Sequence, residues 1–478
     1  MNILMCTSET VPFSKSGGLA DVVGALSFAL AESKENISVF MPLYGSIDQE
    51  RFSPFTTLDI EVLGEVRNTE IVSLVLNNVT FYALKDELFT GRMGIYGNTS
   101  FTPYPDNALR YTLLSLAAVE LAKILKTDIL HCHDWTTGLI PFIVKQQNLK
   151  IKTIYTIHNL AYQGDFSRYD FLFSNLKPTK ACFMGKGREK RFNMMKCGVE
   201  CADIITTVSP TYAYEIQEPK LGCNLYTLLK SRAKDLYGII NGIDIKEWDS
   251  EHDPNFDEHY SLNDFSGKAK LKAEVQEEFG LEVNKDIPLV SMISRIADQK
   301  GFCELLEGDD CALEELAKKM KVQFLIIGTG DSHYEEKLLD IASRYSNVCV
   351  KILFSNRVAH RVEGAADFFL MPSRYEPCGL NQLYSLRYGT LPIARKTGGL
   401  ADSIIDLTEN SQNGTGFLFE EITREGIIEA VEKAIAFYEQ DRDGYQAARK
   451  RAMQRDSSWN ASAEEYKKVY RKLIGGEI

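Results

Sequence analysis

The sequence predicts an α/β protein made of two similar halves, each with a parallel sheet and helical crossovers. Short apolar strand candidates alternate with segments whose apolar residues recur at helical spacing. This alternation stops in a polar stretch at residues 244–268 and then begins again. The length of 478 residues leaves room for two to three domains. Such βα repeats form parallel sheets with right-handed crossovers, and ligands bind at the carboxyl ends of their strands.

The first half begins with a strand candidate and a helix candidate that starts at Leu19. A second, long helix candidate covers residues 109–124. Between them, residues 58–85 alternate in polarity and break at Asn77-Asn78, a pattern typical of hairpins. The remaining strand candidates of this half are residues 2–7, 37–41, 129–132, 153–157, 203–208 and 238–241.

The second half repeats the alternation after the polar stretch. The final helix candidate carries one apolar stripe, from Ala463 to Leu473, and we expect it to return to the first half. The strand candidates of the second half are residues 287–293, 322–327, 348–353, 368–371 and 391–394.

Composition excludes several classes of protein. Hydrophobic residues make up 44% and charged residues 25%, which is typical of a globular chain rather than a disordered or fibrous one. Asp and Glu (66) outnumber Lys and Arg (54), giving a net charge of −12, which disfavours nucleic acid or an anionic membrane as the main partner. No stretch of 18 apolar residues indicates a membrane span, and the start at Met1 lacks a secretory pattern. We expect a cytoplasmic protein, with a mature form processed elsewhere as the alternative.

The ten cysteines show no CxxC motif or paired Cys/His ligands, so we expect buried free thiols rather than a zinc site or disulfide framework. His131 and His133 form an HxH pattern at a strand end, but without a third ligand at suitable spacing a metal is disfavoured. The D-x-D triplet at Asp441 and Asp443 lies in a late helical region, away from every strand end.

Lys15-Ser16-Gly17-Gly18 lies between the first strand and the first helix. Paired glycines let backbone N–H groups approach an anion, and a helix N-terminus adds partial positive charge. The alternative is a tight turn with a solvated lysine. Thr397-Gly398-Gly399 repeats the arrangement before a later helix.

Two further loops follow strands of the second half. Arg295 and Lys300 lie five apart on one loop and can converge on a pyrophosphate, although an exposed basic loop is the competing interpretation. The segment 373–380 contains Glu376, which Pro377 keeps extended, and Gly379 and Leu380 at the start of a helix. A helix-capping glutamate is the alternative there.

These motifs, in this order, resemble those of the bacterial glycogen synthase and plant starch synthase family. The matching segments are KSGGLADVVGAL, HDW, TIHNLAYQG, TTVSPTYAYEI, NGID, SRIADQKG, PSRYEPCGLNQLYSLRYGT and TGGLAD. The resemblance implies the GT-B fold, two Rossmann-like domains around a central cleft. It implies an acceptor-side domain at residues 1–240, joined by the C-terminal helix at 457–478, and a nucleotide-sugar domain at residues 241–456.

The resemblance also implies an activity: transfer of glucose from ADP-glucose to the non-reducing end of an α-1,4-glucan such as glycogen or starch, with retention and release of ADP. It implies no metal and no other cofactor. Two rival classes are a catalytically silent glucan-binding paralogue, which predicts loss of Lys15, Arg295 and Lys300, and a sugar-nucleotide epimerase, which leaves KSGGLADV unexplained. UDP-glucose remains the alternative donor.

The resemblance assigns roles residue by residue. Arg295 and Lys300 would bind the pyrophosphate and stabilise the departing ADP, and Glu376 would contact the donor glucose with Cys378, Gly379 and Leu380. His158 would act on the oxocarbenium side, chiefly through its backbone carbonyl. Asp134 would be a further catalytic residue, on the glucose and acceptor side. The remaining predicted donor, glucose and acceptor contacts are Lys15, Gly17, Gly18, Asp21, Asn159, Asn241, Thr397, Gly398 and Gly399.

The chain departs from the family pattern near the expected adenine site. A family tyrosine there corresponds to Phe354, which can still stack on a base but lacks the hydroxyl. Trp135 is followed by Thr136-Thr137 where the family often has His-Ala.

Overall fold

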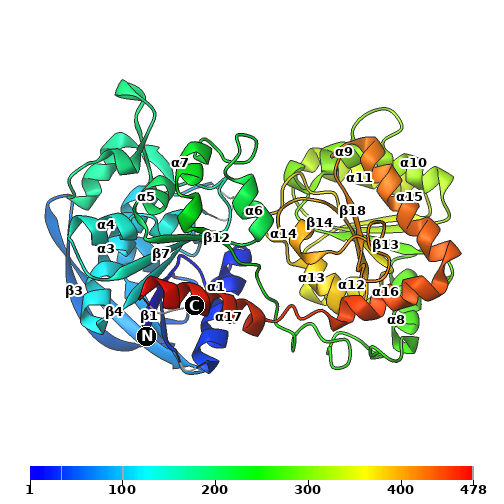
Figure 1. The fold of residues 1–478 in the computed structure, drawn as a ribbon, viewed down its shortest axis with the longest axis horizontal. Helices are drawn as coiled ribbons and strands as arrows, with labels where there is room; N and C mark the ends of the chain where they lie inside the picture. The colour runs from blue at the N-terminus through cyan, green and yellow to red at the C-terminus, as the bar shows by residue number, and fades with distance from the viewer. Residues whose placement is uncertain (34, 99–101, 476–478) are drawn as a thin grey trace. The chain divides into compact units, whose positions relative to one another are not determined.

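The computed structural model describes residues 1–33, 35–98 and 102–475. The chain forms two compact units (Figure 1). Unit 1 comprises Met1–Ile239 with Trp459–Ile478, of which residues 476–478 lie outside the described part, and unit 2 comprises Ile240–Ser458. In the described residues, no helix is both long and apolar enough to cross a membrane.

Unit 1 contains a mixed sheet in the order β12-β11-β7-β6-β1-β2-β5-β4-β3. Its pairs are parallel from β12 to β5, and antiparallel between β5 and β4 and between β4 and β3. The strands are β1 (Asn2–Cys6), β2 (Asn36–Pro42), β3 (Ser53–Val62), β4 (Glu65–Leu76), β5 (Val79–Lys85), β6 (Ile129–His133), β7 (Lys152–Ile157), β11 (Ile204–Thr207) and β12 (Leu236–Gly238).

The predicted hairpin region is confirmed, with Asn77 and Asn78 both at positive φ between β4 and β5. A tight antiparallel connection needs such backbone angles, which asparagine tolerates well. The strand expected at residues 238–241 is wrong in its bounds, because β12 runs from Leu236 to Gly238. Unit 2 begins at Ile240, so the chain leaves the sheet of unit 1 there.

The helices of unit 1 include the final one, α17, as the sequence predicts. Its buried stripe packs against α1, and Tyr470 from that stripe is fully buried. A small sheet of β8 (Asp165–Ser167), β10 (Arg191–Asn193) and β9 (Phe183–Met184) was not expected. The helices are α1 (Gly18–Glu32), α2 (Glu87–Thr90), α3 (Asn107–Leu125), α4 (Ile140–Gln146), α5 (Met194–Cys201), α6 (Pro210–Glu215), α7 (Tyr226–Ser231) and α17 (Trp459–Leu473).

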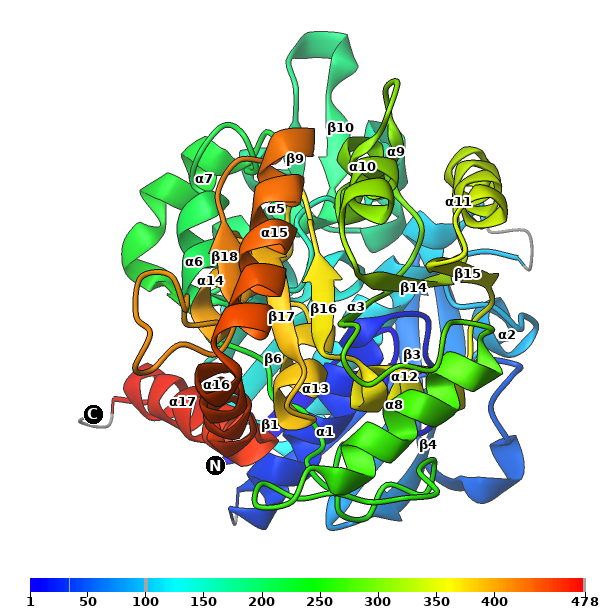
Figure 2. The ribbon, with the colours of Figure 1, turned by 90° about the vertical axis from the view of Figure 1, so that its right-hand side faces the viewer.

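Unit 2 contains a parallel sheet in the order β15-β14-β13-β16-β17-β18. Figure 2 labels the strands of this sheet other than β13. The strands are β13 (Leu289–Ile293), β14 (Gln323–Gly328), β15 (Val348–Ile352), β16 (Phe368–Met371), β17 (Leu391–Arg395) and β18 (Phe417–Phe419). The helices are α8 (Ser266–Glu278), α9 (Phe302–Leu306), α10 (Ala312–Lys319), α11 (Ser332–Arg344), α12 (Asn356–Ala365), α13 (Asn381–Arg387), α14 (Gly398–Ser403), α15 (Arg424–Gln440) and α16 (Arg442–Gln454). Asp441 caps α16 by accepting a hydrogen bond from Gly444 N.

Both faces of this sheet are buried, which is why its strands are almost continuously apolar. Phe324 and Ile326 of β14 pack into one apolar cluster, with residues of α9, α10 and α15. The alternate residues Leu325 and Ile327 pack into a second cluster on the other face, with residues of α8 and α12.

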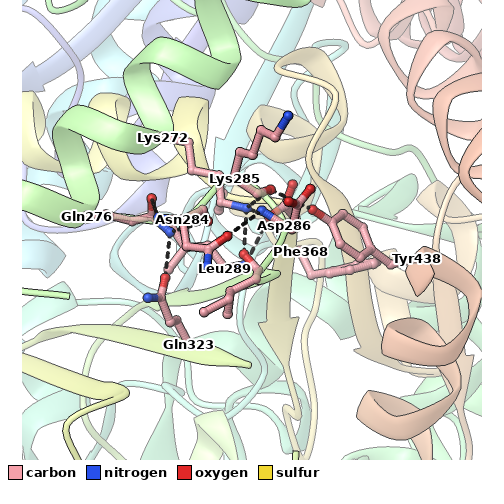
Figure 3. Close-up of polar contacts among 12 residues, drawn as sticks. Lys272, Gln276, Asn284, Lys285, Asp286, Leu289, Gln323, Phe368 and Tyr438 are labelled. Atoms are coloured by element: carbon pink, nitrogen blue, oxygen red, sulfur yellow. Dashed lines mark hydrogen bonds and ion pairs between the residues drawn. The ribbon is translucent and has the colours of Figure 1, made fainter. Parts of the chain in front are cut away.

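A buried polar network anchors the segment that enters β13 (Figure 3). Lys272 Nζ donates to the carbonyls of Lys285 and Ile287 and forms an ion pair of 2.6 Å with Asp367 Oδ2. Asp367 also accepts a bond from Leu289 N. Burial alone would raise the pKa of Asp367, but the charge of Lys272 and these bonds lower it. The start of β13 is thereby fixed to α8 and to the residue before β16.

Candidate active site

The predicted residues of unit 1 gather at one edge of its sheet. Because β1, β6 and β7 are neighbouring parallel strands, their carboxyl ends lie together. Asp134 follows β6, while His158 and Asn159 follow β7. The Lys15–Gly18 loop connects β1 to α1.

Asp134 organises the turn that follows β7. Its Oδ1 accepts a hydrogen bond of 2.8 Å from His158 N, and the Asn159 backbone N–H also bonds to the carboxylate. Asp134 itself has a φ of 55°, a strained backbone for a residue other than glycine. Burial raises the pKa of Asp134 to about 7, against the lowering effect of these bonds. Asp134 and His158 therefore share one edge, and Asp134 fixes the backbone of His158.

Glu9, which the sequence interpretation missed, occupies part of the predicted anion-binding loop. Its carboxylate accepts hydrogen bonds from Ser16 N, from Ser16 Oγ at 3.0 Å and from Gly17 N at 3.3 Å. Tyr96 OH donates a fourth bond at 3.1 Å. Glu9 is 2% exposed, and burial raises its pKa. In this structure two backbone N–H groups that we expected to face a ligand anion instead bind a carboxylate of the chain.

The cation of this loop is also paired. Lys15 Nζ lies 2.8 Å from Asp21 Oδ1, and the Lys15 side chain is half exposed. Gly17 has a φ of −158°, and a Cβ added there would meet no atom within 4 Å. The fold therefore does not itself require glycine at position 17, in contrast to most glycines of the chain.

In unit 2 the predicted residues follow β13, β16 and β17, which are neighbouring strands. Lys300 Nζ pairs with Glu376 Oε2 at 2.5 Å, and Ser373 Oγ donates to the same oxygen at 3.1 Å. Glu376 is 6% exposed. Arg295 is exposed, and its Nη2 donates to Gln299 Oε1 at 3.2 Å. The cationic loop and the glutamate loop thus form one connected cluster.

The second glycine pair packs directly on the Glu376 loop. Gly399 N donates to the Glu376 carbonyl at 3.1 Å. Gly398 has a φ of 43°, and a Cβ there would lie 1.9 Å from the same carbonyl oxygen. Position 398 thus requires glycine for both backbone angle and space. Thr397, the N-cap of α14, lies beside this contact.

Cys378 and Asn241 are also in contact in unit 2. The Asn241 backbone N–H bonds to Cys378, and burial raises the pKa of the Cys378 thiol to about 12. Asn241 Oδ1 is buried with no hydrogen-bond partner among the described residues. Gly379, at a φ of 74°, and Leu380 precede α13. Phe354, the residue predicted to stack on a base, is 86% exposed.

The expectation that all the cysteines are free thiols is wrong for two of them. Cys182 and Cys197 form a disulfide, while the other eight are free. These two cysteines lie fifteen residues apart, and the packing of α5 against the turn at residues 180–182 brings them together. No sequence motif signals such a pairing.

Two surface hollows lie elsewhere in unit 1. They measure about 750 and 650 Å³ and share Arg168, Tyr169 and Lys190 as lining residues. Neither is lined by a predicted site residue. Among the described residues, no group of three or more His, Cys, Asp or Glu side chains is arranged to hold a metal ion.

Comparison with known proteins assigns both units. The starch synthase catalytic domain family matches residues 2–231, and the glycosyl transferases group 1 family matches residues 275–451. Glycogen synthase of Treponema denticola is 38% identical, and that of Anaeromyxobacter sp. is 41% identical, each over 99% of both chains. The catalytic domain of starch synthase IV from Arabidopsis thaliana, solved with ADP and acarbose, has a TM-score of 0.86 and 27% identity, covering 99% of each chain.

Two α/β units, with loop residues clustered at the carboxyl ends of their parallel strands, define a GT-B glycosyltransferase. The similarity extends over the full length of the relatives. The chain belongs to the glycogen synthase family, and it is a retaining glucosyltransferase.

Proposed function

We propose that this enzyme transfers glucose from ADP-glucose to the 4-OH at the non-reducing end of an α-1,4-glucan, with retention and release of ADP. Support comes from the glycogen synthase relatives and from the starch synthase structure that contains ADP and acarbose. The net charge of −12 suits a neutral glucan better than a nucleic acid.

The observation that carries the proposal is the Arg295–Lys300 loop with its glutamate partner. In a chain of net charge −12, two cations follow β13, and the ammonium of Lys300 is held in place by Glu376. Negative charge gathers on the ADP oxygens as the glycosidic bond breaks. Fixed cations beside those oxygens stabilise that charge without reorganising.

We assign the donor contacts of unit 2 as follows. Glu376 and its neighbours Cys378, Gly379 and Leu380 contact the donor glucose. The Thr397-Gly398-Gly399 turn adds N–H contacts to phosphate, and Asn241 faces the glucose. Phe354 stacks on the adenine, which its exposure permits.

The contacts of unit 1 are assigned to glucose, acceptor and distal phosphate. Asp134, His158 and Asn159 line the glucose and acceptor side. Lys15, with Gly17 and Gly18, contacts the phosphate and glucose side, and Asp21 holds Lys15 through the observed ion pair. The Glu9 carboxylate leaves the N–H groups at the start of α1 as the remaining backbone donors of this loop.

We propose that retention arises from departure and attack on the same face of the glucose. The C1–O bond to ADP breaks as the acceptor 4-OH forms the new C1–O bond. The acceptor proton passes to the departing phosphate oxygen. A double displacement would instead need two carboxyl groups about 5 to 5.5 Å apart across the scissile bond.

The test is a transfer assay with radiolabelled ADP-glucose and UDP-glucose on glycogen, each with and without EDTA. The expected result is incorporation from ADP-glucose, far less from UDP-glucose, and no loss with EDTA, because Arg295 and Lys300 supply the cationic charge. Preference for UDP-glucose would overturn the donor assignment. Loss of turnover with EDTA, restored by a divalent ion, would overturn the metal-free assignment.

A further inference from the structure

Three histidines of unit 1, two of them fully buried, form a continuous group at the ends of β6 and β7. His131 and His133 are alternate residues of β6, and their rings lie with centroids 4.2 Å apart. His133 Nδ1 lies 3.0 Å from Nε2 of His158, which follows β7. His131 and His133 are 0% exposed, whereas His158 is partly exposed.

The two β6 histidines differ in how their nitrogens are satisfied. His131 has both partnered, Nδ1 by Tyr470 OH at 2.8 Å and Nε2 by Thr156 Oγ1 at 2.6 Å. His133 has only the bond to His158, and its Nε2 is buried with no partner among the described residues. Burial lowers the pKa of all three histidines, so each ring is neutral at pH 7.

A neutral imidazole has one N–H donor and one acceptor nitrogen. Among backbone groups, buried N–H donors without a partner are rarer than under-satisfied acceptors. The same preference assigns the unpartnered Nε2 of His133 as the acceptor nitrogen and the His133 proton to Nδ1. His133 then donates to His158 Nε2, which leaves the proton of His158 on Nδ1.

We propose that His133 is a positioning residue, which fixes the ring orientation of His158 and the tautomer that presents Nδ1–H as a donor. Asp134 fixes the His158 backbone through a bond to its N–H, so the residue is held at both ends. With the proposed function, the group that accepts from Nδ1–H is a hydroxyl oxygen of glucose. The contact with a glucose hydroxyl rests on the proposed function, whereas the tautomer of His158 is independent of it.

The structural arm of the test is ¹⁵N NMR of the full-length protein labelled at histidine. His158→Ala assigns the His158 signals by their disappearance. The expected wild-type spectrum has a protonated Nδ1 and an unprotonated Nε2 for His158. The opposite pattern would overturn the proposal whether or not the protein transfers glucose.

The variants separate positioning from packing. His133→Phe keeps a ring but loses the donor, and we expect kcat to fall on the order of 10- to 100-fold, the size of a small misplacement. The His158 signals should move toward the other tautomer. His133→Asn retains an N–H donor near the position of Nδ1 and should restore most of kcat.

His131→Phe is the matched control, because it removes two buried hydrogen bonds beside the same strands. It should lower the melting temperature at least as much as His133→Phe, yet leave the His158 tautomer unchanged. Equal effects of both phenylalanine variants on kcat and on the His158 signals would show that packing alone matters. If His133→Phe does not fold, the wild-type spectrum and His133→Asn still decide the proposal.

Discussion

Lys300 and Glu376 neutralise each other in the free enzyme, which changes what Lys300 can contribute to binding. At 2.5 Å from a buried carboxylate, the ammonium already has a partner before substrate arrives. The Glu376 carboxylate therefore weakens the attraction of Lys300 for ADP in the ground state. The negative charge that develops as the glycosidic bond breaks is attracted more strongly by Lys300, so the ammonium stabilises mainly the transition state.

Lys300→Ala should therefore damage turnover far more than donor binding. Removing one preorganised donor costs on the order of 100- to 1,000-fold in kcat, or about 3 to 4 kcal/mol. Arg295 retains part of the hold on the pyrophosphate, so KM for ADP-glucose should move less than about tenfold. Steady-state kinetics with saturating glycogen measure both.

A control is needed because Lys300→Ala also leaves Glu376 buried without its cation. The double variant Lys300→Ala with Glu376→Gln removes that orphaned charge. If the double variant recovers turnover, the loss came from Glu376 rather than from the missing ammonium. A strong rise in KM at unchanged kcat would show that Lys300 is a uniform binder.

Glu9→Gln tests whether the inward-facing carboxylate shapes the Lys15 loop. Ser16 N and Gly17 N both bind Oε2, so the amide oxygen of a glutamine can keep these two bonds. Its NH₂ then stands where Oε1 accepts from Ser16 Oγ and Tyr96 OH, so those two bonds must reverse, and every bond loses the charge of the carboxylate. We expect a stability loss of about 1 to 3 kcal/mol and a fall in kcat/KM of roughly tenfold or more.

Asp86→Asn provides the comparison in the same unit. Asp86 is also a buried carboxylate that accepts a backbone N–H, that of Leu88, and it pairs with Arg67. The hydrogen-bond partners of Asp86 include Arg67, Leu88 and Thr90, none of which is a predicted site residue. Its variant should lose stability in urea titrations but keep kcat/KM. A Glu9→Gln enzyme with normal kcat/KM would mean that Glu9 only supports folding.

At the scale of elements, the two glycine pairs look alike in sequence but differ in structure. Gly398→Ala would place its Cβ 1.9 Å from the Glu376 carbonyl and would strain a left-handed backbone, so both stability and turnover should fall. Gly17→Ala has open space and an extended backbone, so the melting temperature should stay near that of the wild type.

Gly17→Ala should nevertheless raise KM for ADP-glucose if the donor approaches this backbone, because the new methyl group occupies the ligand side. Melting curves and donor saturation curves for both variants measure the contrast. Unchanged kinetics for Gly17→Ala would remove Gly17 from the donor contacts.

How far the sequence predicts the structure depends on what sets each feature. The five strands predicted for unit 2 agree with β13 to β17 within about two residues, because strands buried on both faces give continuous apolar runs. The short edge strand β18 is not among the predicted strands. The strand expected at residues 238–241 failed, since the chain leaves the sheet at the boundary between the units.

The site residues that the sequence predicts correctly are those whose position depends on the strand that precedes them. Asp134 and His158 were expected to share an edge because both follow neighbouring strands, and the bond between them confirms it. Glu9 and His133 were missed as partners of the site, because their contacts reach across a turn or between strands. Local spacing contains no signal for such contacts.

At the scale of the whole molecule, buried histidines should make unit 1 sensitive to acid. Burial lowers the pKa of His131 and His158 to about 3 and that of His133 well below its usual value. The unfolded chain binds protons at these positions near pH 6.5, whereas the folded chain does not. Their stabilisation is complete above that pH and falls as the pH drops toward 3, by at most ~1.4 kcal/mol per histidine per pH unit.

Asp134 acts in the opposite direction. Its pKa of about 7 in the folded chain lies above the unfolded value, so its contribution to stability improves as the pH falls from 7 toward 4. Glu9, whose pKa burial also raises, acts in the same direction as Asp134. Three histidines outweigh these two acids, and unit 1 should lose stability between pH 7 and pH 4.5. His131→Asn should flatten this loss, and Asp134→Asn should steepen it.

Tryptophan fluorescence can follow the two units separately. Trp135 and Trp459 lie in unit 1, and Trp248 lies in unit 2. Melting curves of Trp248→Phe report unit 1, and those of the double variant Trp135→Phe, Trp459→Phe report unit 2. An unchanged melting temperature of unit 1 down to pH 4.5 would contradict the expectation.

The return of α17 to unit 1 has a consequence for synthesis on the ribosome. The helix that covers α1 and supplies Tyr470 to His131 is translated only after the whole of unit 2. The apolar face of α1 therefore stays uncovered until α17 has been synthesised. Unit 2 is contiguous in sequence, so all of its strands are synthesised before α17. Although nascent domains usually fold from the N-terminus onward, here the C-terminal unit is complete before the N-terminal one. During that interval the exposed α1 face is a natural target for a chaperone.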